Sequence, residues 1–237
     1  DGFIVATPAE SHFKVARAII KMQKPLLIEK PMTLSIKDAE ELISLAEKNN
    51  VNMMVGHVLL FHPAINKIKK VISSGTIGDL QYIYSNRLNL GKVRTEENVF
   101  WSLAPHDIAI FQYLTDSKPN VIKSIGSSFL QKDIYDSTLT HLEYENGTKG
   151  HIFVSWLHPF KEHRFVIIGS KGMLHFEDSI NNRPLLFYNN KAEFINKVPS
   201  PFKGGVRKID YNNEQPLENE LKYFISNLDK KIEISSG

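Results

Sequence analysis

Two short passages carry side chains that can bind a ligand and move a proton. Glu29-Lys30-Pro31 directly follows an apolar run, 26–28, and Thr7-Pro8 directly follows another, 3–6. If both runs are strands of a parallel sheet, the passages lie at the carboxyl ends of strands, where open α/β folds bind ligands. A lysine held there can transfer a proton or hydrogen-bond a substrate hydroxyl. Taken alone, Thr7-Pro8 fits an ordinary strand-to-helix turn better than a binding site, and Glu29-Lys30-Pro31 is at least as compatible with a solvated lysine in a loop.

His106 is the second candidate for proton transfer. It follows Pro105 within residues 101–114, which the apolar period predicts to be one helix. The predicted apolar face consists of Ile108, Phe111 and Leu114. His106 then lies at the margin of that face, and a histidine near neutral pH suits a general base that takes the proton of a sugar hydroxyl. A capping or core histidine is as compatible with this position, and the combination with Lys30 favours catalysis.

The other histidines do not form a metal motif. His57 and His62 are five residues apart, as are His158 and His163, and neither pair has the spacing of a zinc protease. The chain has no cysteine, which excludes disulfides, zinc-thiolate sites and a cysteine nucleophile. We therefore expect no metal site.

The composition indicates an ordinary globular protein. Hydrophobic residues make up 42% of the chain and charged residues 23%, which argues against disorder. The 29 basic and 26 acidic side chains give a net charge of +3, too small to indicate a nucleic-acid partner. No apolar run approaches the about 20 residues that span a bilayer. We expect a cytoplasmic protein with neither a nucleic-acid nor a membrane partner.

The first part of the chain, 1–78, alternates strands and helices, which is typical of a parallel α/β sheet. Strands are predicted at 3–7, 26–29 and 51–55, and helices at 9–23, 35–49 and from Pro63 to Gly75. Ser35 and Asp38 have the spacing of a helix cap. We expect 1–78 to be part of a Rossmann-type domain.

Strands dominate the second part, 79–237. They are predicted at 81–90, 138–145, 151–156, 164–168, 173–176 and 185–188, with helices at 101–114 and 216–228 and a loop at 199–211. Asn146-Gly147 is a strong hairpin signal. We expect an α/β domain with an open, mainly antiparallel sheet whose one face packs a helix.

Three passages together resemble the Gfo/Idh/MocA oxidoreductases, the relatives of glucose-fructose oxidoreductase and inositol dehydrogenase. They are Ile4-Val5-Ala6-Thr7-Pro8 followed by His12, Leu27-Ile28-Glu29-Lys30-Pro31-Met32, and Gly75-Thr76-Ile77-Gly78-Asp79-Leu80. The resemblance implies a Rossmann domain that binds NAD or NADP, and a second domain whose open sheet shapes the substrate site and often an oligomer interface. It therefore implies a homo-oligomer formed through the open sheet.

The resemblance also implies roles for single residues. Thr7, Pro8 and His12 would line the cofactor, and Glu29 and Pro31 would position the turn at its nicotinamide end. Lys30 would lie between nicotinamide and substrate, and His106 would accept the hydroxyl proton as hydride leaves. Many family members have an aspartate four residues before this histidine, whereas this chain has Ser102.

The passages 89–94 and 101–107 resemble the subgroup that acts on nucleotide sugars, for instance the 3-dehydrogenases of UDP-N-acetylhexosamines. Lys92 and Arg94 could bind a diphosphate. Trp101 and Asp107 complete the predicted substrate-binding set.

No Gly-x-Gly precedes Glu29, although the family's glycine turn and ribose-binding acid belong to the start of the Rossmann domain. We expect both to fall before Asp1, a closing helix to follow Ser236-Gly237, and dinucleotide binding by this stretch to be weak or absent. Two alternatives to the dehydrogenase stay open: a ligand-sensing regulator of the same fold, which Ser102 favours, and an inactive fragment.

Overall fold

The computed structural model describes residues 1–95 and 97–230, which form two compact units. The first unit holds residues 1–62 and the segment from Glu214, and the second holds Pro63–Asn213. The units thus divide the chain before Pro63 and again at Glu214 rather than after Gly78. The first division falls before Pro63 because helix α3 (Pro63–Ser73) packs against helix α4 (Val99–Thr115), which belongs to the second unit. The turn and closing helix expected around Ser236-Gly237 lie outside the described residues.

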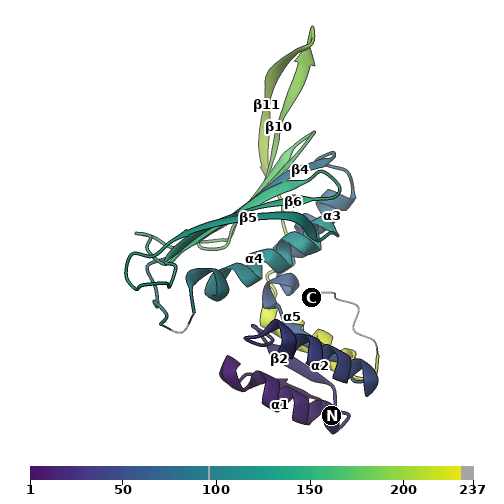
Figure 1. Cartoon of the computed structure of the whole chain (residues 1–237). Helices are drawn as coiled ribbons and strands as arrows, with labels where there is room; N and C mark the ends of the chain where they lie inside the picture. The colour runs from purple at the N-terminus through teal and green to yellow at the C-terminus, as the bar shows by residue number, and fades with distance from the viewer. Residues whose placement is uncertain (96, 231–237) are drawn as a thin grey trace. The chain divides into compact units, whose positions relative to one another are not determined.

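A parallel three-stranded sheet forms the centre of the first unit (Figure 1). Its order is β1 (Phe3–Val5), β2 (Leu26–Glu29) and β3 (Met53–Gly56). Helices α1 (Ala9–Lys21), α2 (Ile36–Lys48) and α5 (Pro216–Ser226) and the short 3₁₀ helix η1 (Val58–Phe61) accompany it. The predicted alternation of strand and helix is confirmed.

Apolar periodicity explains the core of this unit. α1 buries Ala16, Ile19 and Ile20 at helical spacing against Ile28 of β2 and Leu42 of α2. The predicted cap of α2 is confirmed as well. Ser35 Oγ accepts a hydrogen bond from the backbone N–H of Asp38, with 3.4 Å between the two atoms.

The second unit is built on an eight-stranded sheet in the order β11-β10-β9-β8-β4-β7-β6-β5. The strands are β4 (Leu80–Leu88), β5 (Pro119–Ser127), β6 (Ser137–Tyr144), β7 (Lys149–Ser155), β8 (Glu162–Gly169), β9 (Met173–Glu177), β10 (Leu185–Ile195) and β11 (Val198–Lys208). β4 and β7 pair in parallel, and the other neighbours pair antiparallel. The mainly antiparallel sheet is confirmed.

The predicted loop at 199–211 is wrong, because Val198–Lys208 is strand β11. β10 and β11 form a long hairpin that extends beyond the neighbouring strands (Figure 1). Its turn is Asn196-Lys197, both with positive φ, 52° and 67°. This is the turn that two-residue hairpins favour, but without the glycine that usually marks it. The prolines of β11 are tolerated because β11 is an edge strand.

Helix α4 covers one face of the large sheet, contacting β7, β4 and β6. It comes close because Gly150 of β7 has no side chain: a Cβ there would lie 3.1 Å from the ring of Phe111. Alternation along β4 sends Ile83, Ser85 and Arg87 toward α4, and Tyr84 toward the opposite face, the open face. The second unit thus has the helix-covered and open faces expected from its sequence.

Candidate functional site

In the first unit, His12 connects the turns that follow β1 and β2. Its Nε2 lies 2.7 Å from the carbonyl oxygen of Thr7, and its Nδ1 lies 2.9 Å from the carbonyl oxygen of Pro31. The side chain is 1% exposed because α1 places it on the buried face of the helix. His12 therefore holds together the two passages that the sequence singled out.

The hydrogen-bonding capacity of the ring makes this contact specific. A carbonyl oxygen only accepts hydrogen bonds, and a neutral imidazole has one N–H to donate. One ring nitrogen of His12 can thus donate a hydrogen bond to one of the two carbonyl oxygens, while the other nitrogen lies against the second. The structure thus gives His12 a role in positioning the two turns, whereas its direct contact with a cofactor stays a prediction.

Thr7 and Pro8 are exposed at the amino end of α1. Ser11 Oγ lies 2.6 Å from Thr7 Oγ1 and 2.8 Å from the carbonyl oxygen of Pro8, so the first turn of the helix fixes the hydroxyl of Thr7. The first N–H groups of a helix have no partner within it and favour an anion or a polar ligand. This end of α1 can therefore receive a phosphate or ribose group.

Glu29-Lys30-Pro31 forms a turn with a cis bond between Lys30 and Pro31. The backbone N–H of Lys30 lies 3.3 Å from Glu29 Oε2, and the side chain of Lys30 is half-buried. Glu29 stands opposite Gly56 of β3 in the sheet. A Cβ on Gly56 would lie 3.3 Å from the Glu29 carboxyl group, so the glycine leaves room for this carboxylate.

Two further titratable groups, His57 and Glu220, are affected by the charges of Lys30 and Glu29. The sequence did not predict either of them as part of the site. Burial, followed by the charge of Lys30, lowers the pKa of His57 to about 4, so the imidazole is neutral at pH 7. Burial, followed by the charge of Glu29, raises the pKa of Glu220 to about 7. The sequence marks His57 only by its spacing to His62, and Glu220 lies in a predicted helix whose packing partner no local pattern identifies.

In the second unit, α4 presents His106. Asn98 caps the helix, its Oδ1 lying 3.1 Å from the backbone N of Trp101, and Pro105 follows within the helix. Because Pro105 has no N–H, it cannot bond the carbonyl group of Trp101 one turn earlier. His106 is half-buried and its Nδ1 is a buried atom. His106 thus lies at the margin of the buried face, as predicted.

A buried ion pair fixes this part of α4 to the sheet. Arg87 Nε lies 2.7 Å from Asp107 Oδ2, and Arg87 Nη2 lies 3.4 Å from Asp107 Oδ1. The two residues are 5% and 0% exposed. Asp107 was predicted to bind substrate, but a fully buried carboxylate held by Arg87 has no surface to offer one. We assign Asp107 to positioning the turn of α4 that carries His106.

His163 extends the buried pair. Arg87 Nη1 lies 3.5 Å from His163 Nδ1. Burial, followed by the charges of Arg87 and Lys161, lowers the pKa of His163 to about 3, so its ring is neutral and can accept the hydrogen of Arg87. A signal for this network was present in the sequence, because Arg87 occupies an inward position of its strand and Asp107 an inward position of its helix.

The remaining predicted substrate residues lie on the segment that leads into α4. Lys92 is exposed, and Trp101 in the first turn of α4 is 50% exposed. Arg94 Nε lies 3.8 Å from Glu97 Oε1, and the Arg94 carbonyl oxygen accepts a hydrogen bond of 2.8 Å from Gln131 Nε2. These three side chains and His106 belong to the second unit, whereas the Thr7, His12 and Lys30 group belongs to the first.

Within residues 1–95 and 97–230, no three His, Asp or Glu side chains gather in a way that could hold a metal ion. No helix in the same residues has the length and apolar character needed to cross a bilayer.

Comparison with known proteins places both halves of the chain. Residues 1–57 match the family model "Oxidoreductase family, NAD-binding Rossmann fold", and residues 65–175 match "GFO/IDH/MocA C-terminal domain". A UDP-N-acetylglucosamine 3-dehydrogenase from Acidithiobacillus ferrooxidans is 28% identical over 95% of this chain and 69% of its own length. A scyllo-inositol 2-dehydrogenase (NAD(+)) from Bacillus subtilis is 23% identical over 84% of this chain and 61% of its own length.

An uncharacterized oxidoreductase from Streptococcus pneumoniae is 26% identical over 75% of this chain and 52% of its own length. The chain thus spans between 52% and 69% of the length of these three relatives.

Solved structures agree on the fold. The Acidithiobacillus ferrooxidans UDP-N-acetylglucosamine 3-dehydrogenase matches with a TM-score of 0.80 at 24% identity, over 95% of this chain and 69% of that one. An inositol dehydrogenase homologue from Azotobacter vinelandii, solved with NAD+, matches with a TM-score of 0.78 at 19% identity, over 95% and 66%. With both family models matched along one chain and the same fold in these neighbours, the protein belongs to the Gfo/Idh/MocA oxidoreductase family.

Proposed function

We propose that this chain belongs to an NAD- or NADP-dependent dehydrogenase that oxidises a secondary hydroxyl of a sugar or nucleotide sugar. The observation that carries this proposal is the turn Glu29-Lys30-Pro31 at the carboxyl end of β2, which His12 ties to the turn after β1. Strand ends of this kind are where doubly wound sheets bind dinucleotides.

The described residues fit one side of such a cofactor. The exposed Thr7 hydroxyl and the amino end of α1 suit its ribose or phosphate groups, and Gly56 leaves space beside Glu29. When bound, the nicotinamide supplies the hydride acceptor. Both NAD and NADP stay in the proposal, because relatives of either kind match this chain.

Side chains of this protein would bind the substrate hydroxyl and take up its proton. Lys30 would hold the substrate hydroxyl by a hydrogen bond from its ammonium group, and His106 would accept the hydroxyl proton on a ring nitrogen as the carbonyl forms. The ion pair of Arg87 and Asp107 would keep His106 in place, which compensates for the lack of an aspartate at Ser102.

A nucleotide sugar is the substrate that the second unit favours. Lys92 and Arg94 offer two positive charges on one short segment, and a guanidinium group binds phosphate oxygens in pairs. The half-exposed indole of Trp101 provides a flat apolar surface on which a uracil or sugar ring can stack. A UDP-N-acetylhexosamine combines both features, as the name of the Acidithiobacillus relative indicates.

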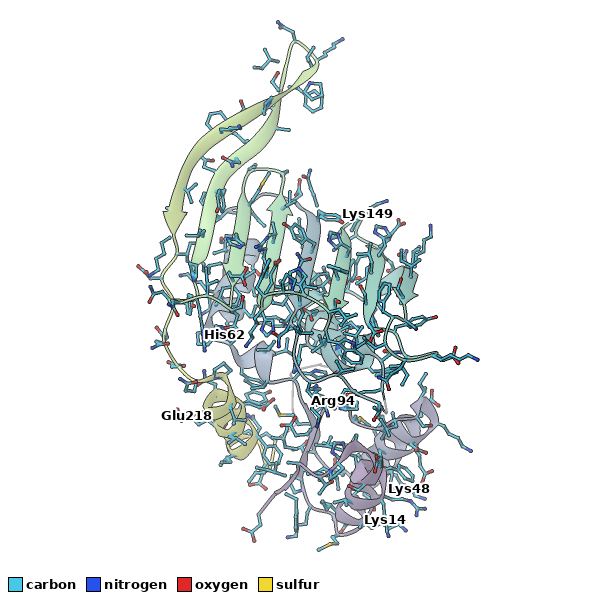
Figure 2. The ribbon with its side chains drawn as sticks, turned by 90° about the vertical axis from the view of Figure 1, so that its left-hand side faces the viewer. Lys14, Lys48, His62, Arg94, Lys149 and Glu218 are labelled. Atoms are coloured by element: carbon cyan, nitrogen blue, oxygen red, sulfur yellow. The ribbon has the colours of Figure 1, made fainter. Side chains whose placement is uncertain are left out.

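Turnover by the full-length protein expressed from its gene tests the proposal, with UDP-N-acetylglucosamine and either NAD or NADP. Lys30→Ala and His106→Asn should each lower kcat by about 100-fold or more with an unchanged circular dichroism spectrum, since a positioned proton-transfer group contributes about 10² to 10⁴. Lys14→Ala is the matched control, because Lys14 is exposed on α1 (Figure 2).

The alternatives predict other results. A ligand-sensing regulator would bind nucleotide sugar or dinucleotide without turnover. The wild type and Lys30→Ala would then both show no turnover. An inactive protein would bind neither. Unchanged turnover in both variants would refute the catalytic assignment.

The open face of the large sheet is the proposed surface for a second copy of the chain, in the cytoplasm. Its strands carry half-buried aromatic and aliphatic side chains, with Tyr84 stacked on His151 at 5.0 Å between ring centres and Val166 directly opposite Tyr84. Val166→Glu should lower the oligomeric mass seen by sedimentation, and Lys208→Glu on the edge strand β11 should not. An unchanged mass for Val166→Glu would exclude this interface.

A further inference from the structure

Glu220 is a carboxyl group buried in an unusual way. It is 0% exposed, and neither of its carboxyl oxygens has a hydrogen-bond partner among the described residues. Buried polar groups are nearly always hydrogen-bonded, and an ionised carboxylate without donors is far more costly to bury than a neutral carboxylic acid. A group in this state is therefore most stable with a proton on it.

Two contacts hold helix α5 in place, one on either side of Glu220 in the sequence. Asn219 Nδ2 donates a hydrogen bond of 3.3 Å to the carbonyl oxygen of Phe61 at the end of η1. The rings of Tyr223 and Phe61 lie 5.5 Å apart between centres. α5 is thus attached to the segment that follows β3, and Glu220 lies between these two contacts in the sequence.

The charged surroundings also favour the neutral acid. The titratable groups on the segments around Glu220 are Glu29 at the end of β2 and Lys30 directly after it, His57 and His62 on either side of η1, and Glu218 and Lys222 on α5 itself. The negative charge of Glu29 acts on Glu220 and adds to the effect of burial in raising its pKa. Glu218, labelled in Figure 2, instead pairs with Lys222 on the surface of α5, with 2.6 Å between Lys222 Nζ and Glu218 Oε1.

We propose that Glu220 is a positioning residue that keeps its proton in the folded protein below neutral pH, so that the turn carrying Lys30 then has one neighbouring carboxylate, Glu29, instead of two. Loss of that proton buries a second negative charge beside Glu29. The two carboxylates then repel each other, which displaces the turn Glu29-Lys30-Pro31. Binding of a dinucleotide at this turn weakens as a result, and this part of the inference rests on the proposed function.

The test compares Glu220→Gln with the wild-type protein, because an amide has the same shape as the neutral acid and cannot ionise. Stability of the wild type should fall as pH rises from about 4.5 to about 7, the window between the pKa of an unfolded glutamate and that of Glu220. Glu220→Gln should lose this fall and should lack the infrared band of a protonated carboxyl group near pH 6. Glu218→Gln, which removes an exposed carboxylate from the same helix, should keep both features.

Cofactor affinity provides the second readout. The wild type should lose affinity for NADH by up to about tenfold per pH unit above pH 7, since one proton is involved, and Glu220→Gln should not. Glu220→Ala removes the carboxyl group without replacing its shape. If Glu220→Gln keeps its affinity for NADH above pH 7 and Glu220→Ala does not, the filled volume matters as well as the absence of a charge; if both keep it, ionisation alone is responsible.

The proposal is overturned if wild type and Glu220→Gln share the same dependence of stability on pH, or if the infrared band survives the substitution. Because these two measurements need no turnover, they stand even if the protein proves not to be a dehydrogenase. Absence of NADH binding at every pH in every variant would instead count against the proposed function alone.

Discussion

Asp107→Asn should destabilise the second unit far more than the loss of an average ion pair. Arg87 and Asp107 are 5% and 0% exposed and are joined at 2.7 Å and 3.4 Å. The amide keeps the shape of the carboxylate but leaves the guanidinium charge of Arg87 buried and uncompensated. Breaking a buried pair from one side costs about 3–5 kcal/mol. At about 2–4 °C per kcal/mol for 150–250 residues, the melting temperature should fall by roughly 6–20 °C.

Urea unfolding followed by tryptophan fluorescence measures this loss selectively. Both tryptophans, Trp101 and Trp156, belong to the second unit, so their emission reports on the part that contains the pair. Asp116→Asn is the matched control. Asp116 pairs with Lys69 but its side chain is 77% exposed, and asparagine tolerates its positive φ of 51°. This control should lose less than about 1 kcal/mol.

A double variant tests the cause. Arg87→Met combined with Asp107→Leu removes both charges and should recover much of the stability that Asp107→Asn loses, because replacing a buried pair by apolar groups is often neutral. The reasoning is refuted if Asp107→Asn costs no more than Asp116→Asn, or if the double variant is less stable than the single one. Asp107→Asn should also lower kcat at a temperature where the protein is still folded, since His106 is the neighbouring residue.

Three further outcomes are expected. His12→Ala removes both contacts between the turns after β1 and β2 and should weaken NADH binding by up to about 30-fold, measured by calorimetry, because each hydrogen bond contributes about 1 kcal/mol and 1.4 kcal/mol is about tenfold. Burial raises the pKa of Asp136, but N–H donors from Leu130, Phe129 and Trp156 outweigh it and hold that pKa below its usual range. The stabilisation by Asp136 is present above the usual pKa of an aspartate and is lost as pH falls below it, so Asp136→Asn should flatten the acid limb of a stability profile measured by fluorescence. Gly169→Ala places a Cβ 2.2 Å from the carbonyl oxygen of Ile77 and should cost about 1–3 kcal/mol in urea unfolding, whereas Gly205→Ala meets no atom within 4 Å and should be neutral.

Elements with one buried face were predictable from the sequence, and elements without one were not. The period of α1 and the alternation of β6 and β7 around Asn146-Gly147 identify their structures, because each buries one set of side chains. β5 and the outer half of the β10–β11 hairpin are exposed on both sides, so no alternation marks them. The hairpin turn at Asn196-Lys197 also lacks the usual glycine.

The candidate site, too, could be predicted only in part from the sequence. Lys30 and Thr7 could be placed at strand ends because each directly follows its own strand. The partners that hold the site are remote in sequence: Arg87 is 20 residues from Asp107, and His12 is 19 residues from Pro31. A contact between side chains on different elements depends on how those elements pack, which a single sequence does not specify. Glu220 is the extreme case, since its neighbour Glu29 belongs to the opposite end of the chain.

Transfer of an isotopic label tests the central claim most directly. The full-length protein is incubated with oxidised cofactor and UDP-N-acetylglucosamine that carries deuterium at C3, and the cofactor is analysed by mass spectrometry. The account predicts one deuterium at C4 of the nicotinamide ring with the wild type and almost none with Lys30→Ala. A wild-type protein that binds the nucleotide sugar and the cofactor yet moves no deuterium would contradict hydride transfer from this substrate.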